Sequence, residues 1–127
     1  MKILFLGDVV GISGCSKIMN NLLEQIKENK IDFVIVNAEN ADDSGVGLTK
    51  EICEDFFKCG VNVITTGNHV WDQKDIMNYI DKENRLLRPK NLFEPAPGKG
   101  FEIYTTEKNI KIAVLNLMGN VFMKKCD

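Results

Sequence analysis

The sequence predicts an α/β fold whose sheet is largely parallel and flanked by helices, followed by a C-terminal β-hairpin. Two runs, Lys2–Leu6 and Ile31–Val36, are apolar almost throughout, and the segment between them has the spacing of an amphipathic helix. Strands that are apolar on both faces and separated by a helix are typical of a parallel sheet covered on both sides. Polar residues follow these strands, as expected where ligands bind at the carboxyl edge of such a sheet.

Length and composition indicate one soluble domain over residues 1–127. A chain of 127 residues with 44% hydrophobic residues is apolar enough to bury a single core. No apolar run approaches the roughly 20 residues that span a bilayer, and Met1 and Lys2 lead directly into a strand, so we expect a cytoplasmic protein without a membrane segment. The net charge of −2 provides no basic surface for an extended nucleic-acid groove, but it does not exclude a short nucleotide.

The cysteines favour neither a disulfide framework nor a zinc knuckle. They lie far apart and form no C-x-x-C pair. We therefore expect reduced thiols at all four positions, Cys15, Cys53, Cys59 and Cys126.

The first half of the chain reads as two helices between three strands. After a loop with Gly11 and Gly14, one helix carries its apolar residues at helical spacing. The second helix follows a glycine-rich loop at 44–47, with Thr49 as its N-cap and Gly60 as a left-handed C-terminal cap. The residues at helical spacing in the first helix are Ile18, Leu22, Leu23 and Ile26; in the second, Ile52, Phe56 and Cys59 are expected to face the core.

The second half is more irregular. Val61–Ile64 is a short β-branched strand, and residues 72–75 resemble the capped start of a helix that carries Ile76, Tyr79 and Ile80. Leu86–Pro89 is read as a short strand closed by proline, and 91–100 as a surface loop. Phe101–Thr105 and Lys111–Leu115 then form the hairpin about a turn at 107–109.

Polar side chains follow four of these strands at the point where each strand ends. Carboxylate and amide oxygens suit Mn²⁺, Mg²⁺ or Fe²⁺, and an imidazole widens the choice towards zinc. Any one of these residues could simply belong to a solvated loop, and a lone histidine is more often structural than functional. Their shared edge nevertheless predicts a divalent-metal site, in which a carboxylate could bridge two ions. The residues are Asp8, Glu39, Asn40, Asn68, His69 and Asn116.

Three further features admit two interpretations each. Trp71 could stack on a nucleobase, but an aromatic residue beside a helix start is more often part of the core. Arg88 could contact a substrate phosphate or form a surface salt bridge. Gly11, Gly14 and the glycine-rich loop at 45–47 could cradle phosphate, yet no G-x-G-x-x-G motif follows the first strand, which argues against a dinucleotide cofactor.

Over its whole length the sequence resembles the calcineurin-like metallophosphoesterases, and within them the YmdB-like branch of 2′,3′-cyclic nucleotide phosphodiesterases. The wider superfamily has Asp-x-His in its first motif, whereas Val10 stands at the histidine position here, as is usual for this branch. The matching motifs are Ile3–Gly11, Asn37–Ala41, Gly45–Thr49, Gly67–Asp72, Leu86–Pro89 and Asn116–Met123.

The resemblance implies an N-terminal half of an α/β/β/α sandwich with a dinuclear metal centre. Asp8 would bind one ion, Glu39 would bridge both, and Asn40 and Asn68 would complete parts of the two shells. His69 would protonate the leaving alkoxide rather than bind metal. Arg88 and Asn116 are weaker candidates for substrate contacts.

The chain also departs from the family. Members are longer, and their second half brings a Gly-x-His-x-His type motif, whereas this chain has one histidine. We therefore expect either a fragment, a chain completed by another segment or subunit, or a degenerate remnant, with self-association through an uncovered sheet. Two functions follow as alternatives: a metal-dependent phosphodiesterase acting on small phosphoesters such as cyclic nucleotides, or an inactive half-domain that binds metal, nucleotide or a partner chain.

Overall fold

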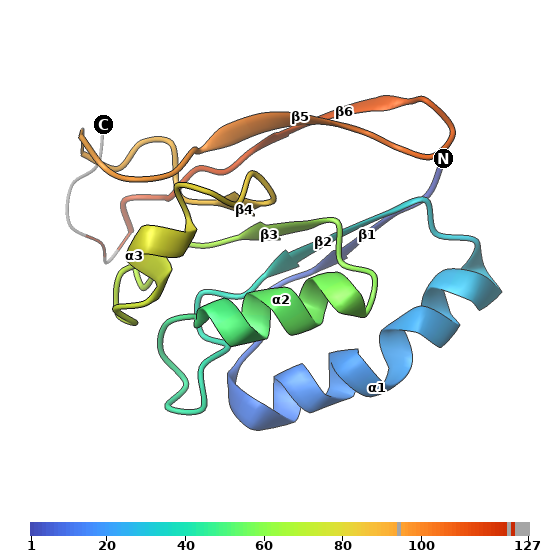
Figure 1. Cartoon of the computed structure of the whole chain (residues 1–127), viewed down its shortest axis with the longest axis horizontal. Coiled ribbons are helices and arrows are strands. Elements are labelled where there is room, and N and C mark those ends of the chain that lie inside the picture. The colour runs from blue at the N-terminus through green and yellow to red at the C-terminus, as the bar shows by residue number, and fades with distance from the viewer. Residues whose placement is uncertain (94, 122, 124–127) are drawn as a thin grey trace.

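The structure is a computed structural model, and it describes residues 1–93, 95–121 and 123. Cys126, expected as a reduced thiol, lies outside the described residues, as does Phe122 of the last matching motif. Four strands and three helices precede a two-stranded hairpin (Figure 1). In chain order the elements are β1 (Ile3–Leu6), α1 (Gly11–Asn29), β2 (Phe33–Asn37), α2 (Lys50–Lys58), β3 (Val63–Thr65), α3 (Ile76–Tyr79), β4 (Leu86–Leu87), β5 (Phe101–Thr105) and β6 (Lys111–Leu115).

The central sheet has the order β1-β2-β3-β4, and every neighbouring pair is parallel. The register places Leu6 beside Val36 and Asn37 beside Thr65, so the strands end close together. The predicted parallel sheet is therefore confirmed. Its carboxyl edge carries the residues that follow each strand, and these form the site described below.

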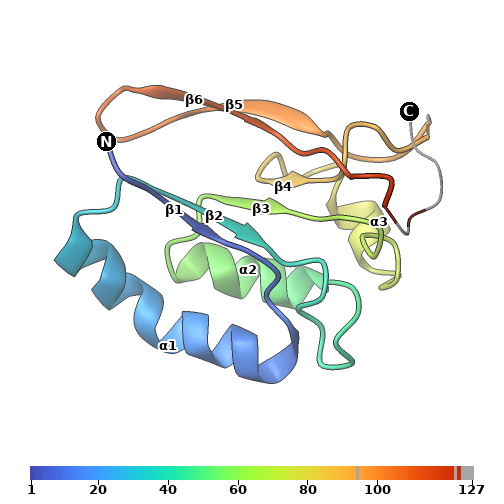
Figure 2. The same ribbon diagram turned by 180° about the vertical axis from the view of Figure 1, so that it is seen from behind.

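The sheet lies between two layers. Helices α1 and α2 cover one face, and the β5–β6 hairpin lies across the other (Figures 1 and 2). Along β2 and β3 the side chains alternate: Val34, Val36 and Ile64 pack with the helices, whereas Phe33 and Val63 pack with Ile112 and Val114 of the hairpin. The apolar runs in the sequence are thus explained by burial on both faces.

The α1 helix begins earlier than expected, because Gly11 and Gly14 belong to its first turn rather than to a loop. The Gly14 amide donates to the Val10 carbonyl, and a Cβ at Gly14 would lie 3.1 Å from the Val9 side chain. The glycine therefore lets the helix start directly against the end of β1.

The caps of α2 agree with the sequence. The Thr49 hydroxyl accepts a hydrogen bond from the Ile52 amide, and Gly60 has a φ of 103° just beyond the helix. The expected capping of α3 by residues 72–75 is wrong. Asp75 makes no side-chain cap there and instead accepts a hydrogen bond from the Lys50 amide at the start of α2. Its carboxylate satisfies a free amide of a different helix.

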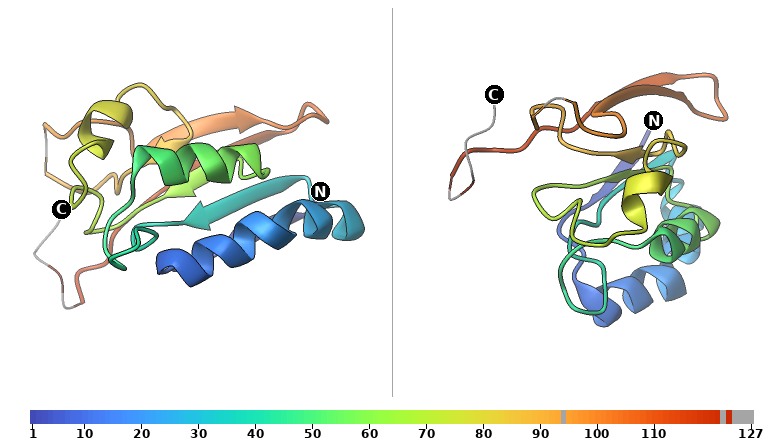
Figure 3. Two further views of the ribbon diagram at one scale, coloured as in Figure 1. Left: turned by 60° about the horizontal axis from the view of Figure 1, so that its bottom comes forward. Right: turned by 60° about the vertical axis from the view of Figure 1, so that its left-hand side comes forward.

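The hairpin covers only part of the sheet; the right-hand view of Figure 3 shows it over the sheet on the side away from α1 and α2. Ile3 and Phe5 on β1 are 47% and 59% exposed. The outer face of the hairpin is apolar as well, since Phe101 pairs with Leu115 and both are about half exposed. No helix in the described part of the chain has the length and apolar character needed to cross a bilayer.

Candidate functional site

A cavity of about 550 Å³ lies at the carboxyl ends of β1, β2 and β3. It contains five residues that the sequence singled out as metal ligands or acid. The spacing of the strands brings them together, although Asp8 and His69 are far apart in the chain. The lining residues are Phe5, Gly7, Asp8, Asn37, Glu39, Asn40, Asn68, His69 and Met123.

Asp8 is held in place by the segment that follows β2. The Asn40 amide nitrogen donates to Asp8 Oδ1 at 2.8 Å, and the Gly11 amide donates to the Asn40 carbonyl at 2.9 Å. Asp8 itself has a φ of 50°, a conformation that non-glycine residues rarely adopt. This left-handed residue ends β1 and lets the chain pass directly to α1 while the carboxylate stays at the cavity.

Glu39 lies against the backbone of Gly67. A Cβ on Gly67 would approach both carboxylate oxygens of Glu39 to 2.3 Å, so any side chain there would displace the carboxylate. The His69 amide donates to Glu39 Oε2 at 3.4 Å. Gly67 thus provides the space in which Glu39 reaches the β3 corner.

His69 and Asn68 stand at the same corner. The Asn68 side chain is exposed, whereas His69 is half-buried. The His69 Nδ1 atom lies 2.6 Å from Asp72 Oδ2, three residues further along the turn. One ring nitrogen is therefore engaged by a carboxylate, while the ring still lines the cavity.

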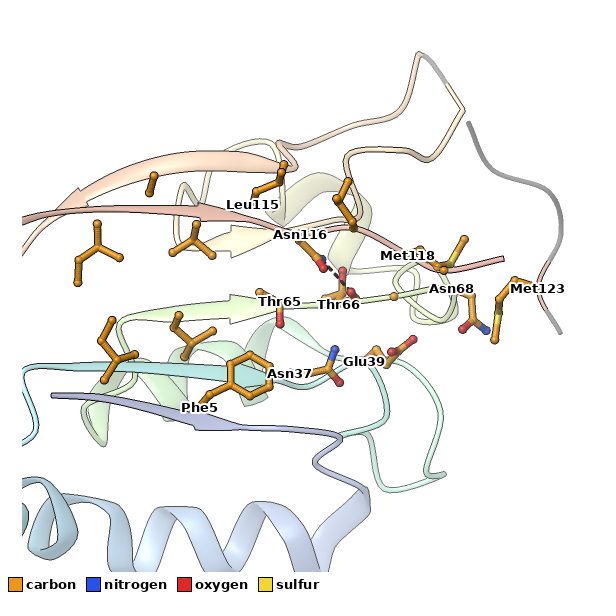
Figure 4. A pocket seen from close by; sticks show the side chains of 18 of the residues that line it. Phe5, Asn37, Glu39, Thr65, Thr66, Asn68, Leu115, Asn116, Met118 and Met123 are labelled. Atoms are coloured by element: carbon orange, nitrogen blue, oxygen red, sulfur yellow. Dashed lines mark hydrogen bonds between the residues drawn. The ribbon is translucent and has the colours of Figure 1, made fainter. Parts of the chain in front are cut away.

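A second, larger cavity of about 750 Å³ opens beside the first, between the sheet and the hairpin (Figure 4). Phe5, Asn37, Glu39, Asn68 and Met123 line both cavities. The walls of the larger one are apolar along β1, β2 and β6 and become polar towards Glu39 and Asn68.

Asn116 lies in the wall of the larger cavity. Its amide nitrogen donates to the carbonyls of Thr66 at 2.8 Å and Leu87 at 3.1 Å. Asn116 therefore ties the end of β6 to the ends of β3 and β4. Its expected role as a substrate contact stays a prediction.

Arg88 lies in the core instead of at the surface. It is 3% exposed, and its guanidinium donates to the carbonyls of Pro89, Ala96 and Pro97. It lines neither cavity. In this arrangement Arg88 holds the loop at 95–100, and its expected contact with a substrate phosphate stays a prediction.

Trp71 and the glycine-rich loop both pack against neighbouring parts of the fold. Trp71 is half-buried and packs against the core between sheet and helices, in line with the commoner interpretation. The loop packs beside the β3 corner, where a Cβ on Gly47 would lie 2.9 Å from Gln73 and 3.2 Å from Asp72.

The side chains around the first cavity carry oxygen atoms of the kind that bind a divalent cation, but there are too few of them for a complete site. Asp8 and Glu39 supply carboxylates, and Asn40 and Asn68 supply amides, which are oxygen ligands suited to hard ions. Within residues 1–93, 95–121 and 123, however, no three His, Cys, Asp or Glu side chains are placed to hold a metal ion. A divalent ion at this cavity would need further ligands beyond these four side chains.

Comparison with known proteins decides the family. The family model described as YmdB-like protein matches residues 4–127. The chain belongs to the YmdB-like family. A relative in Bacillus subtilis (strain 168), the 2′,3′-cyclic-nucleotide 2′-phosphodiesterase, is 40% identical over 127 residues; these are all of this chain and 47% of that protein.

Two solved structures share the fold of this YmdB-like chain. A hypothetical protein from Thermus thermophilus superposes with a TM-score of 0.89 at 31% identity, over all of this chain and 48% of that one. A novel phosphatase from Mycoplasma pneumoniae superposes with a TM-score of 0.83 at 39% identity, over 94% and 43% of the two chains. This YmdB-like chain therefore spans about half the length of the relatives it matches.

Sequence reasoning missed two residues at this YmdB-like site. Gly67 stands out in the sequence only as part of a motif, although its missing side chain is what admits Glu39. Asp72 is expected at a helix start, although its carboxylate contacts His69. The three-residue spacing of His69 and Asp72 is the available signal, because a tight turn brings such positions together.

Proposed function

We propose that this chain contributes one half of a metal-dependent phosphodiesterase site that hydrolyses small phosphoesters such as 2′,3′-cyclic nucleotides. The observation that supports the proposal is the convergence of Asp8, Glu39, Asn40, Asn68 and His69 on one cavity. The name of the Bacillus subtilis relative agrees with the substrate class.

Each residue has a task that its position allows. Two divalent ions, when bound, would supply a nucleophilic hydroxide at neutral pH and positive charge for the phosphoryl oxygens. Asp8 and Glu39 provide the anionic donors, and Asn40 orients Asp8 through its amide hydrogen bond. Asn68 presents an amide to the cavity, and His69 gives a proton to the ribose oxygen that leaves phosphorus.

The rest of the site comes, in this proposal, from a further polypeptide segment that covers the exposed walls between β1 and the hairpin. Ile3 and Phe5 of β1 are 47% and 59% exposed there, and neighbouring exposed apolar side chains mark a surface that another polypeptide covers. The same segment would supply the missing metal ligands. A second copy of the chain is the competing occupant.

Metal content and hydrolysis test the proposal together. Tag-free chain would be assayed for bound Mn²⁺ and for hydrolysis of bis-p-nitrophenyl phosphate and 2′,3′-cyclic AMP, alone and with the unmatched half of the Bacillus subtilis relative as a separate polypeptide. We expect turnover only in the mixture, and loss of turnover with Glu39→Gln but not with Glu51→Gln, an exposed residue of α2. Turnover that survives Glu39→Gln would contradict the assignment.

One observation favours a second function, an inactive half-domain that binds metal, nucleotide or a partner chain. The described residues place no three His, Cys, Asp or Glu side chains around a metal. If the mixture binds nucleotide without hydrolysing it, and Glu39→Gln leaves that binding intact, the half-domain function is the correct one.

A further inference from the structure

We propose that Asp72 is the positioning residue for His69, fixing its ring so that Nε2 is the nitrogen presented to the substrate, and that the glycine-rich loop at 45–47 exists to seat Asp72. The inference rests on the proposed function, because it assigns Asp72 a role in the same reaction. It also gives a structural role to the glycine-rich loop, which the proposed function does not use.

The ring geometry determines which nitrogen is free. His69 Nδ1 and Asp72 Oδ2 are 2.6 Å apart, which places the ring nitrogen and the carboxylate in a short, direct hydrogen bond. A carboxylate can only accept, so Nδ1 must carry the hydrogen. The neutral ring then has its lone pair on Nε2, and in the imidazolium form Nε2 carries the proton that can be donated.

Backbone hydrogen bonds and one buried side chain hold the turn that carries His69 and Asp72. The Val70 amide donates to the Gly67 carbonyl, and the Asp72 amide donates to the His69 carbonyl. Val70 between them is fully buried. These contacts hold the backbone of the turn, so His69 and Asp72 start from fixed positions on the same side of it.

The glycine-rich loop fixes the other side of Asp72. Gly47 has a φ of 88°, and its Cα faces the Asp72 side chain so closely that a Cβ would lie 3.2 Å away. The Gln73 side-chain amide donates to the Val46 carbonyl at 3.1 Å. The loop thus packs against the turn at two consecutive residues.

The loop is itself tied to the site. The Gly47 amide donates to the Glu39 carbonyl at 2.7 Å, and the Asp42 amide donates to the Gly47 carbonyl at 2.9 Å. Hydrogen bonds from the Ser44 hydroxyl and amide hold the pKa of Asp42 below its ordinary value. Glu39, the loop, Asp72 and His69 therefore form one closed chain of contacts, since the His69 amide returns to Glu39.

An NMR experiment can read the ring directly, because His69 is the only histidine of the chain. Long-range ¹⁵N–¹H correlation on tag-free protein, at about pH 9 where an ordinary imidazole is neutral, shows which ring nitrogen carries the hydrogen. We expect the Nδ1–H form in the wild-type chain. Asp72→Asn keeps the shape of the side chain, but its amide can donate a hydrogen bond to Nδ1 as well as accept one. We therefore expect the Nε2–H form of the ring to become populated.

Two further variants make the test specific. Asp43→Asn removes the same charge from an exposed residue of the neighbouring loop, and we expect it to leave the ring unchanged. Gly47→Ala adds a methyl group for which there is no room beside Asp72. We expect it to displace Asp72 and to populate the Nε2–H form of the ring, as Asp72→Asn does. Should Asp72→Asn fail to fold, Gly47→Ala still reports on the contact from the other side.

The ring result stands whether or not the chain hydrolyses anything. An Nε2–H ring in the wild type, or an Nδ1–H ring that persists unchanged in Asp72→Asn, would overturn the proposal. In a mixture that turns over 2′,3′-cyclic AMP, Asp72→Asn should lower kcat by up to about 10²-fold with little change in KM, no more than loss of His69 itself. No turnover in any mixture, with the expected ring form, would refute the proposed function and leave the positioning role intact.

Discussion

Replacing Gly67 by alanine would separate the stability of the fold from the geometry of the site. The new Cβ would lie 2.3 Å from both carboxylate oxygens of Glu39 and 2.5 Å from its carboxyl carbon. Ordinary contact begins near 3.4 Å, so the carboxylate has to move by roughly 1 Å. Gly67 does not have a positive φ, and alanine is therefore compatible with its backbone.

The expected effect on stability is small. Glu39 is only half-buried, and the displaced atoms are at the end of a flexible side chain that can rotate towards the cavity. Alanine in place of glycine also stabilises by about 0.4–1 kcal/mol through the unfolded chain. We therefore expect the free energy of unfolding to change by less than about 1 kcal/mol.

The expected effect on the site is large by comparison. A shift of about 1 Å in a reacting or coordinating group can cost about 10²-fold in rate. In the mixture with the complementing half, if the proposed function holds, Gly67→Ala should lower turnover by that order. The amide signal of His69 should move in a ¹⁵N–¹H spectrum because its acceptor Glu39 has moved.

Urea unfolding, the ¹⁵N–¹H spectrum and turnover check these three expectations. Gly119→Ala is the matched control, because no atom lies within 4 Å of the Cβ that it would add. A loss of more than about 2 kcal/mol in Gly67→Ala would mean that the contact with Glu39 is rigid, which would refute the reasoning. An unchanged His69 amide signal would refute it as well.

Three other substitutions test the surroundings of the site. Arg88→Met should destabilise the chain by about 3 kcal/mol in urea unfolding, because buried carbonyls lose their donor, whereas the exposed Arg85→Met should cost less than about 1 kcal/mol. Hydrogen bonds from Lys108 and from a backbone amide lower the pKa of Asp32, so the stability that this carboxylate provides is present above the ordinary Asp pKa and is lost as the pH falls through the lowered value. Asp32→Asn should therefore flatten the acid limb of a stability–pH profile, and an unchanged limb would show that the hairpin contact contributes nothing. Thr49→Ala should cost about 1 kcal/mol by thermal unfolding, and a neutral result would mean that another group caps α2.

The parallel sheet was predictable because its signal is local. Ile31–Val36 and Val61–Ile64 are apolar on both faces, and only strands covered on two sides tolerate that composition. Thr49 and Gly60 bound α2 through the chemistry of their own backbone positions. The expected start of α1 is wrong: Gly11 and Gly14 are poor helix formers, yet both lie in its first turn, with Gly14 close against Val9.

Contacts across the fold were not predictable from local patterns. Asp75 reads as a cap for the helix that follows it, yet its carboxylate meets the Lys50 amide, 25 residues earlier in the chain. The sequence allows Arg88 a phosphate contact or a surface salt bridge but does not predict its burial, because nothing near it indicates that the loop at 95–100 returns over it. The convergence of Asp8, Glu39 and Asn68 was predictable, because parallel strands end at one edge whatever the loops do.

Phe5 connects the exposed apolar walls with the cavity at which we propose the metal site. This side chain is 59% exposed and lines both the larger cleft and the cavity that holds Asp8 and Glu39. A polypeptide segment that buries Phe5 must therefore pass beside both carboxylates. The same segment would then both cover the sheet and supply further metal ligands. Metal affinity would therefore increase when Phe5 becomes buried. Phe5→Ala should accordingly weaken Mn²⁺ binding by a mixture with the complementing half, although Phe5 itself offers no ligand. Unchanged Mn²⁺ affinity in that mixture would show that burial of Phe5 and metal binding are independent.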